Sequence, residues 1–244
     1  MEVNKILPQA YYDPSTGLIS AQKLYQKLKV QGVTLKQVQD FLKKQEVVQL
    51  LKPAVKLKVY FPITSFEPHE HLQIDLMDLS NVATTNSYYK YLLVSIDIFT
   101  RKAFVVPLKT KNSESVVEGM KTIINHFNPK IITTDNGKEY INKELTVLLK
   151  SHKIEHRFVD VNQHATLGLI DRFCRTLRLY INKYLTSRGT TRYIDGLPKL
   201  VENYNNTYHS TINCTPNEAN KHIDEINLIM MKKYMKAKKQ RTNF

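Results

Sequence analysis

The chain has few of the sequence features that are typical of secreted and membrane proteins. Its 244 residues include only two cysteines, Cys174 and Cys214, which provide neither a disulfide framework nor a four-cysteine zinc site. No apolar run approaches the roughly 18 residues that a membrane helix requires. The N-terminal stretch MEVNKILP also lacks the apolar segment of a signal peptide. We therefore expect neither secretion nor membrane anchorage.

Acidic residues are scarce relative to basic ones. The chain has 22 Asp and Glu against 36 Lys and Arg, which gives a formal net charge of +14. Most of the excess lies in residues 1–68 and 232–244, on either side of a nearly neutral middle. This distribution indicates a polyanionic partner, with nucleic acid favoured over a membrane because no basic amphipathic helix has a strongly apolar face. A solvated basic surface without a ligand would give the same charge count.

Residues 20–46 have the pattern of two short helices separated by Gly32. Thr34 and Gln37 have the spacing of a capping box that begins the second helix. A helix pair with lysines on its outer faces is compatible with DNA binding, although many helix pairs bind nothing. Residues 1–68 contain no histidine or cysteine, so we expect no His/Cys zinc site there.

From residue 72 onward the sequence alternates apolar and polar residues in the manner of β-strands. Three strands with short connections, and therefore antiparallel, are followed by alternating helices and strands. This order predicts a mixed α/β sheet with helices on its faces. The predicted strands cover residues 72–79, 88–99, 103–108, 130–134 and 154–159, and the predicted helices cover 113–127, 142–150, 167–185, 193–208 and 216–239.

Three carboxylates lie at positions that suit metal-dependent chemistry. Asp75 lies inside an apolar strand, where an unpartnered charge is costly to bury, and Asp135 ends a short buried strand. Asp171 lies near the start of a helix, and 35 residues separate it from Asp135. Two strands and a helix can bring such acids to a pair of Mg²⁺ or Mn²⁺ ions for phosphoryl transfer. Taken alone, Asp171 is equally well explained as a first-turn acid that pairs with Arg175.

Basic residues accompany these acids along the chain. Arg175 and Arg178 lie four and seven residues after Asp171, on the same helix face, where they would grip a phosphate backbone. Other basic residues extend this patch. The candidate DNA-contacting residues are Lys138, His164, Arg172, Arg175, Arg178 and Lys183.

Four segments together resemble a known family. HLQIDLMDL, TTDNGKEY, LGLIDRFCRTLR and YNNTYHSTINCTPNEA, in this order and spacing, resemble the catalytic core of DDE-type retroviral and retrotransposon integrases. Residues 11–45 look most like the integrases of Maverick/Polinton-type, virus-borne DNA transposons. The resemblance implies an RNase H-like mixed five-stranded sheet flanked by helices, preceded by a small helix-turn-helix-like domain.

The resemblance also implies an activity. It maps Asp75, Asp135 and Asp171 onto the three catalytic acids that hold two Mg²⁺ or Mn²⁺ ions. It implies trimming of DNA 3′ ends and their joining to double-stranded target DNA by a homo-oligomer, in the host nucleus or at a viral replication site. We expect a helical DNA-binding domain over 1–51, a linker over 52–68, the integrase core over 69–225 and a basic helix or tail over 226–244.

One departure from the family concerns the third acid, which is normally Glu and here is Asp171. The side chain is shorter by one methylene, and a misplacement of about 1 Å can cost around 10²-fold in rate. Three alternatives stay open: an active integrase whose helix compensates, a domesticated DNA-binding or architectural protein, and a nuclease that cuts without joining. Glu139 would be a substitute acid, although a supporting or surface role is favoured for it.

Other conspicuous residues are expected to be structural. Asp97 should end a strand and pair with Arg101, and Cys174 should pack in the core because it lies in no nucleophile pattern. His69 and His71 have a ligand-like spacing, but no cysteine lies near them in the sequence, so zinc is not expected.

Overall fold

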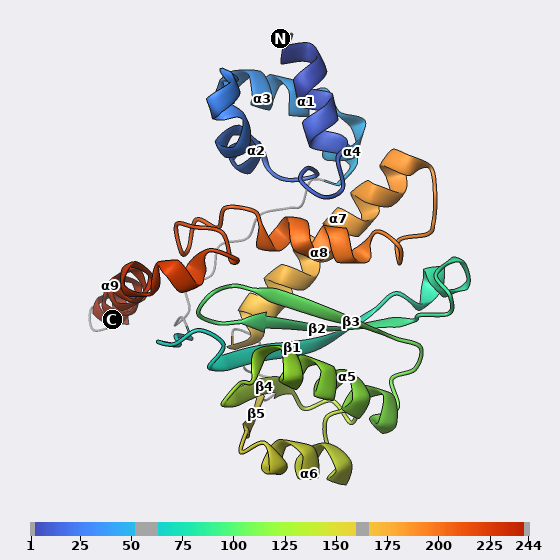
Figure 1. Cartoon of the computed structure of the whole chain (residues 1–244), viewed down its shortest axis with the longest axis vertical. Helices are drawn as coiled ribbons and strands as arrows, with labels where there is room; N and C mark the ends of the chain where they lie inside the picture. Colours follow the sequence, from blue (N-terminus) through green and yellow to red (C-terminus); the bar gives the residue numbers. More distant parts are fainter. Residues whose placement is uncertain (1–2, 52–62, 160–165, 242–244) are drawn as a thin grey trace.

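The computed structural model describes residues 3–51, 63–159 and 166–241. Its centre is a five-stranded mixed sheet in the order β3-β2-β1-β4-β5 (Figure 1). β2 runs antiparallel to its neighbours β1 and β3, and β4 and β5 run parallel to β1. The sheet therefore has the predicted mixed architecture. The strands are β1 His71–Asp78, β2 Tyr91–Asp97, β3 Ala103–Leu108, β4 Ile131–Asp135 and β5 Glu155–Val159.

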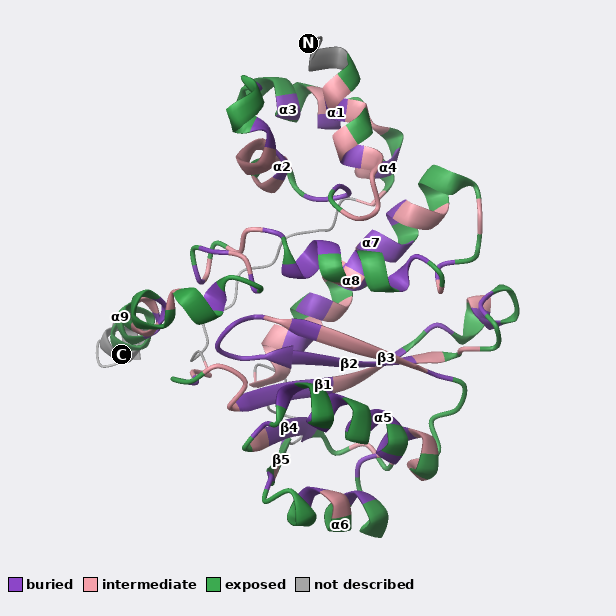
Figure 2. Cartoon of the chain, in the orientation of Figure 1, coloured by how far each residue is buried: buried purple, intermediate pink, exposed green. Residues whose placement is uncertain are grey.

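Helices cover both faces of the sheet. α5 and α6 lie against one face, and α7 and α8 lie against the other (Figure 1). Alternate residues of β2 face the two layers: Leu92 and Val94 pack with α7, and Leu93 packs with α5. Figure 2 accordingly shows β1, β2 and much of α7 buried, whereas α6 and α9 carry extensive exposed surface. These helices are α5 Ser113–Phe127, α6 Lys143–Ser151, α7 Gly168–Arg188, α8 Leu197–Asn205 and α9 Ile223–Arg241.

The N-terminal segment is helical, as expected. The predicted capping box is present, because Thr34 Oγ1 accepts a hydrogen bond from Gln37 N at 3.3 Å and Gln37 Oε1 accepts one from Thr34 N at 2.8 Å. Two further helices flank the predicted pair. The four helices are α1 Val3–Tyr12, α2 Ala21–Leu28, α3 Leu35–Lys43 and α4 Glu46–Leu50.

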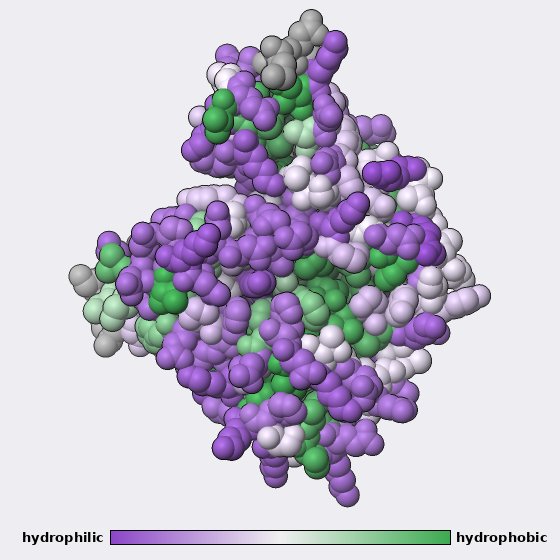
Figure 3. Space-filling model, viewed as in Figure 1, coloured by the Kyte–Doolittle hydropathy of each residue, from purple (hydrophilic) through white to green (hydrophobic). Residues whose placement is uncertain are grey.

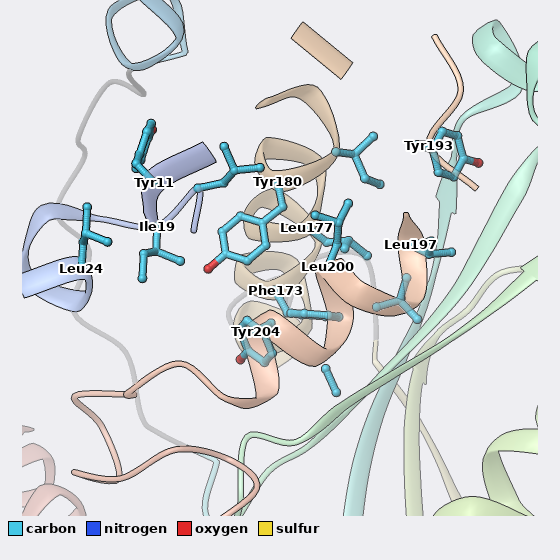
Figure 4. Packing of buried hydrophobic residues seen from close by; sticks show 14 of the residues in the cluster. Tyr11, Ile19, Leu24, Phe173, Leu177, Tyr180, Tyr193, Leu197, Leu200 and Tyr204 are labelled. Atoms are coloured by element: carbon cyan, nitrogen blue, oxygen red, sulfur yellow. The ribbon is translucent and has the colours of Figure 1, made fainter. Parts of the chain in front are cut away.

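These helices share a hydrophobic core with α7 and α8. Tyr11 and Leu24 belong to the same buried cluster as Phe173 and Tyr180 (Figure 4). Asn203, on α8, donates a hydrogen bond from Nδ2 to the carbonyl of Gly17 at 2.7 Å. The N-terminal segment is thus packed onto the outer side of the α7 and α8 layer.

The two C-terminal helices are shorter than predicted. α8 begins at Leu197 because Pro198, which has no N–H and fixes its own φ, is tolerated only in the first helical turn. The chain then turns through an isolated β-bridge between His209 and Cys214 before α9 begins at Ile223. In the described ranges, no helix combines the length and the apolar character needed to span a membrane.

An apolar cavity lies at the edge of the sheet, between β3 and α8. Its volume is about 510 Å³, and its walls include Phe104, Pro107, Leu197 and Val201. Figure 3 shows an apolar area in the middle of this face, with mostly polar side chains around it. Because β3 is an edge strand, this is a surface on which a further polypeptide can pack.

Candidate active site

The parallel register of β1 and β4 brings two of the predicted acids together. Leu72 lies opposite Ile132 and Gln73 lies opposite Thr133. The same register, continued toward the carboxyl ends of the strands, places Asp75 beside Asp135. Burial raises the pKa of Asp75 above its ordinary value, and the negative charge of Asp135 raises it further.

Cys174 contacts the first acid. Its Sγ lies 3.7 Å from Asp75 Oδ2 as a donor, while Asp75 Oδ1 accepts a hydrogen bond from Leu76 N at 2.7 Å. Burial, followed by the charge of Asp75, raises the pKa of Cys174, so the thiol keeps its proton and can donate. Cys174 packs against the hydrophobic core, as expected, and it contacts Asp75 in addition. Its position three residues after Asp171, on a neighbouring part of one helix face, was the available sequence signal.

Glu139 lies on the other side of the pair, beside Asp135. A Cβ atom on Gly137 would lie 2.8 Å from Glu139 Oε2 and 3.0 Å from Asp135 Oδ1, so glycine is what leaves room for both carboxylates. Gly137 N also donates to Asp135 Oδ1 at 3.0 Å. The charge of Glu139 contributes to the raised pKa of Asp75. Glu139 is thus part of the acidic region, in a supporting position.

A buried tyrosine lies next to these acids. Tyr140 is 2% exposed, and its hydroxyl has no hydrogen-bond partner among the residues that the structure describes. Burial raises the pKa of Tyr140, and the charges of Asp75, Asp135 and Glu139 raise it further. The hydroxyl therefore stays protonated beside the carboxylates.

The third predicted acid, Asp171, lies in the first turn of α7 and is half-buried. Its charge raises the pKa of Cys174, which places it on the Cys174 side of the acidic region. Gln73 holds the start of this helix against β1. Its Oε1 accepts from Ile170 N at 3.0 Å, and its Nε2 donates to the carbonyl of Thr166 at 2.7 Å. Sequence reasoning missed Gln73, although a polar residue two positions before Asp75, on the same strand face, was a usable signal.

The donor chemistry of this region fits a hard divalent cation. Carboxylate oxygens are the ligands that Mg²⁺ and Mn²⁺ prefer, and a cation would relieve the crowded negative charge around Asp75. As arranged, however, no group of three or more His, Cys, Asp or Glu among the described residues has metal-site geometry. Asp75, Asp135 and Asp171 would therefore have to close around a cation.

The structure separates the predicted DNA-contacting residues. Lys138, Arg172, Arg175 and Arg178 are exposed, and Arg178 Nη2 donates to the carbonyl of Asp78 at 3.2 Å. His164 lies outside the described residues. The exposed members remain available to a nucleic acid that approaches the start of α7.

Lys183 is a correction to the predicted patch. It is 6% exposed, and its Nζ lies 5.3 Å from the centre of the Tyr11 ring. Burial lowers the pKa of Lys183 to about 8. The N-terminal helices cover this part of α7, and the helix pattern alone could not reveal that cover.

Asp97 ends β2, as predicted, but its expected pairing was wrong. Its Oδ2 accepts a hydrogen bond from Thr100 N at 2.8 Å and another from the Thr100 hydroxyl. No ion pair joins Asp97 to Arg101, both of which the structure describes.

Comparison with known sequences shows what this core is related to. Residues 66–164 match the family model of the integrase core domain. A transposon-derived protein of Caenorhabditis elegans is 29% identical over 140 residues, which cover 57% of this chain and 48% of that protein. The retrovirus-related Pol polyprotein from transposon 412 of Drosophila melanogaster is 27% identical over 133 residues, which cover 53% of this chain and 11% of that polyprotein. The chain thus spans about half or less of the length of these relatives.

Solved structures share the fold. A chain of the simian T-cell lymphotropic virus intasome, in complex with PP2A regulatory subunit B56 gamma, has a TM-score of 0.60 at 18% identity, covering 82% of this chain and 74% of that one. The HTLV-2 integrase catalytic core domain in complex with magnesium, in its trimeric form, has a TM-score of 0.52 at 21% identity. The likeness covers 62% of this chain and 96% of that one. The sheet and its flanking helices therefore have the RNase H-like fold that was expected. Residues 66–164 of this chain match the integrase core domain model, and the chain is similar to transposon-derived and retrovirus-related proteins.

Proposed function

We propose that the chain is a DNA integrase, a polynucleotidyl transferase that trims the 3′ ends of element or viral DNA and joins them to target DNA. The observation that carries this proposal is the pair formed by Asp75 and Asp135 on adjacent parallel strands, within the segment that matches the integrase core. The resemblance of residues 11–45 to the integrases of Maverick/Polinton-type elements further favours an origin in such elements. The place of action would be the host nucleus or a viral replication site.

Asp75, Asp135 and Asp171 would hold two Mg²⁺ or Mn²⁺ ions. When bound, such ions activate the attacking oxygen and stabilise the leaving oxygen of phosphoryl transfer. The residues of the chain supply the rest: the Cys174 thiol orients the Asp75 carboxylate, and Gln73 holds the start of α7 beside it. The HTLV-2 core domain, which shares the fold, was solved with magnesium, and this supports the choice of ion.

DNA binding would involve exposed basic residues on both sides of the acids. Lys138 lies three residues after Asp135, in the segment that follows β4, and Arg172, Arg175 and Arg178 continue along α7. His164 and the basic C-terminal segment would add further contacts. Positive side chains of this kind position a phosphate backbone without reading its sequence.

A homo-oligomer follows from the proposed reaction, because joining two DNA ends needs at least two active sites. The apolar cavity between β3 and α8 supports this, since it lies on an edge strand that a second chain can cover. The similar HTLV-2 core was described in trimeric and dimeric forms.

The decisive experiment is a strand-transfer assay on a labelled DNA duplex, with Mg²⁺ or Mn²⁺ and with a chelator. Joined products that need the cation would support the proposal. Cut products without joined ones would indicate a nuclease, with a preference for RNA–DNA hybrids as a further mark. DNA affinity that persists in the chelator without any product would indicate an architectural DNA-binding protein. The shortened Asp171 and the absence of metal-site geometry among the described residues favour that second candidate.

A further inference from the structure

Arg101 is a buried cation that forms no ion pair with the residues that the structure describes. It is 7% exposed, and its Nε has no hydrogen-bond partner among them. Its Nη2 contacts only the thioether of Met230, at 4.0 Å, among the hydrogen bonds of the described residues. Burial lowers the pKa of Arg101 to about 10, although the charge of Asp97 offsets part of this effect. Arginine is almost never buried without a partner, so this side chain is suited to binding an anion.

The backbone at Arg101 is also unusual. Its φ is 64°, in the left-handed region that costs energy for a residue with a side chain. The turn is fixed by Arg101 N, which donates to the carbonyl of Asp97 at 3.0 Å, and by the hydrogen bonds between Asp97 and Thr100. The carboxylate of Asp97 is thereby occupied on its own turn, and the guanidinium points away to α9.

The charge of Arg101 acts on two further basic side chains, which come from later segments. Lys233 follows Met230 by three residues on α9, and its Nζ donates to the carbonyl of Thr211 at 3.0 Å. Thr211 N in turn donates to His209 Nδ1 at 3.3 Å. Hydrogen bonds therefore join Lys233 to His209 through Thr211, and Met230, about one helical turn before Lys233, contacts Arg101.

His209 is neutral here. Burial lowers the pKa of His209 to about 3, and surrounding positive charges lower it further. With Nδ1 accepting a hydrogen bond, the proton of the neutral ring lies on Nε2, which is then a donor. The positive charges that act on His209 belong to Arg101, Lys23, Arg172 and Lys233.

The group therefore combines five separate segments of the chain, with Arg101 in the turn between β2 and β3 and His209 between α8 and α9. Lys23 comes from α2 of the N-terminal segment, Arg172 from the first turns of α7, and Lys233 from α9. Arg101 is buried, whereas Arg172 and Lys233 are exposed, so the group extends from the interior of the protein to its surface. We name these five residues the cationic cluster: Lys23, Arg101, Arg172, His209 and Lys233.

We propose that the cationic cluster binds a phosphate of the DNA backbone. A guanidinium presents paired N–H donors that match two phosphate oxygens, and lysines add charge without directional demand. His209 Nε2 would donate a further hydrogen bond. This inference rests on the proposed DNA-joining function, and it adds a contact point that begins beside the acids, at Arg172, and spans the N-terminal helices, the core and α9.

The test measures affinity for a labelled DNA duplex by fluorescence anisotropy, over a series of salt concentrations in a chelator, so that the acids and their cations take no part. The full-length variants are R101K, K233Q and the control K150Q, an exposed lysine on α6. Thermal melting checks that each variant is folded. If R101K does not fold, the exposed K233Q still decides the question.

We expect R101K to weaken DNA binding about tenfold, because it keeps the charge but loses the paired donors. We expect K233Q to lower the slope of log affinity against log salt by about 0.9, the value for one phosphate contact. K150Q should change neither. Inorganic phosphate should raise the melting temperature of the natural protein and have less effect on K233Q.

The inference is overturned if R101K and K233Q bind DNA like the natural protein while the natural protein still joins DNA; the proposed function then stands alone. If the natural protein neither binds nor joins DNA, both proposals fail as stated. In that case, stabilisation by inorganic phosphate that R101K abolishes would identify a site for a small anion only.

Discussion

Helix α7 separates two regions of opposite charge. Cys174 lies on the side that contacts Asp75, whereas Arg172, two residues earlier and so about 200° around the helix, acts on Arg101 and His209. The acidic region gathers carboxylates around one parallel strand pair. The cationic cluster gathers positive charge from segments that are distant in the sequence. Each region gathers side chains of one charge sign, as expected of sites for a cation and for a polyanion.

The difference between the two regions lies in how each is built. The acidic region depends on strand register, which is short-range and can be followed from the pattern of the sequence. The cationic cluster depends on the packing of the N-terminal helices and α9 against the core. Variants of the acidic region should therefore change catalysis with little effect on DNA affinity, and those of the cationic cluster should do the reverse.

The largest effect is expected from Asp75→Asn, which keeps the shape of the side chain and removes its charge. Loss of several kcal/mol of metal-dependent stabilisation corresponds to a fall in DNA joining of about 10³-fold or more. DNA affinity in a chelator should not fall. Asp195→Asn, an exposed carboxylate paired with Arg192, is the matched control. Joining that survives in Asp75→Asn would remove the acidic region from catalysis.

Asp171→Glu should raise the rate of joining by about 10²-fold if the missing methylene leaves the carboxylate about 1 Å short. The measurement is single-turnover joining with Mg²⁺, beside the natural protein and Asp195→Asn. A slower Asp171→Glu enzyme would show instead that α7 has already moved to suit the shorter side chain.

Glu139→Gln should weaken Mn²⁺ binding about tenfold, because it removes a carboxylate that flanks Asp135. Calorimetry or Mn²⁺-dependent thermal stabilisation measures this without relying on activity. Glu144→Gln, an exposed acid on α6, is the control. Unchanged Mn²⁺ affinity in Glu139→Gln would place the cation away from this side of the acidic region.

Alkylation of Cys174 tests its contact with Asp75. Since the charge of Asp75 raises the thiol pKa, Asp75→Asn should lower that pKa and increase the reactive thiolate several-fold at pH 9. Peptide mass spectrometry after limited iodoacetamide treatment reports the rate, with Cys214 as the internal reference. Equal rates in both proteins would contradict the contact.

The smallest effect is expected from Lys183→Met, on stability. Burial lowers the pKa of Lys183 from 10.5 to about 8, so the folded state resists its protonation. Below pH 8 both folded and unfolded states carry the proton, and the cost of the buried charge is fully present. Between about pH 8 and 10.5 the unfolded state binds more protons, so the stability of the natural protein should rise with pH.

Lys183→Met should remove that rise and increase the melting temperature at pH 7 by about 2–4 °C for each kcal/mol gained. Melting curves at pH 7 and pH 10 measure both effects. Lys150→Met, on exposed α6, is the control. A lower melting temperature at pH 7 would mean that the contact with the Tyr11 ring outweighs the cost of burial.

Elements with strong local signals were predicted well. The predicted strand over 103–108 and helix over 113–127 coincide with β3 and α5, and Asn112 caps α5 by accepting from Ser115 N at 3.0 Å. α1 and α4 were missed. α4 has only five residues and α1 contains Pro8, so their stability comes from packing rather than from sequence pattern.

The positions of two of the acids could also be predicted from strong local sequence signals. Asp75 and Asp135 were predicted because each lies on a strand with a clear apolar pattern, and the register then brings them together. The catalytic and metal-binding roles of all three acids, Asp75, Asp135 and Asp171, remain predictions. The DNA-binding role given to Lys183 was wrong because that assignment used the helix face alone, whereas helices of the N-terminal segment bury the side chain.

The sequence by itself determined the mixed sheet, the family resemblance and the paired acids, because strand periodicity, helix caps and short motifs act over a few residues. Only the tertiary structure decided that Cys174 contacts Asp75, that Lys183 is buried, and that Arg101 contacts Met230 on α9. Those outcomes depend on which surfaces bury one another. The free energy of burial is proportional to the apolar area and has no direction. A short sequence pattern therefore cannot show which two surfaces will pack together.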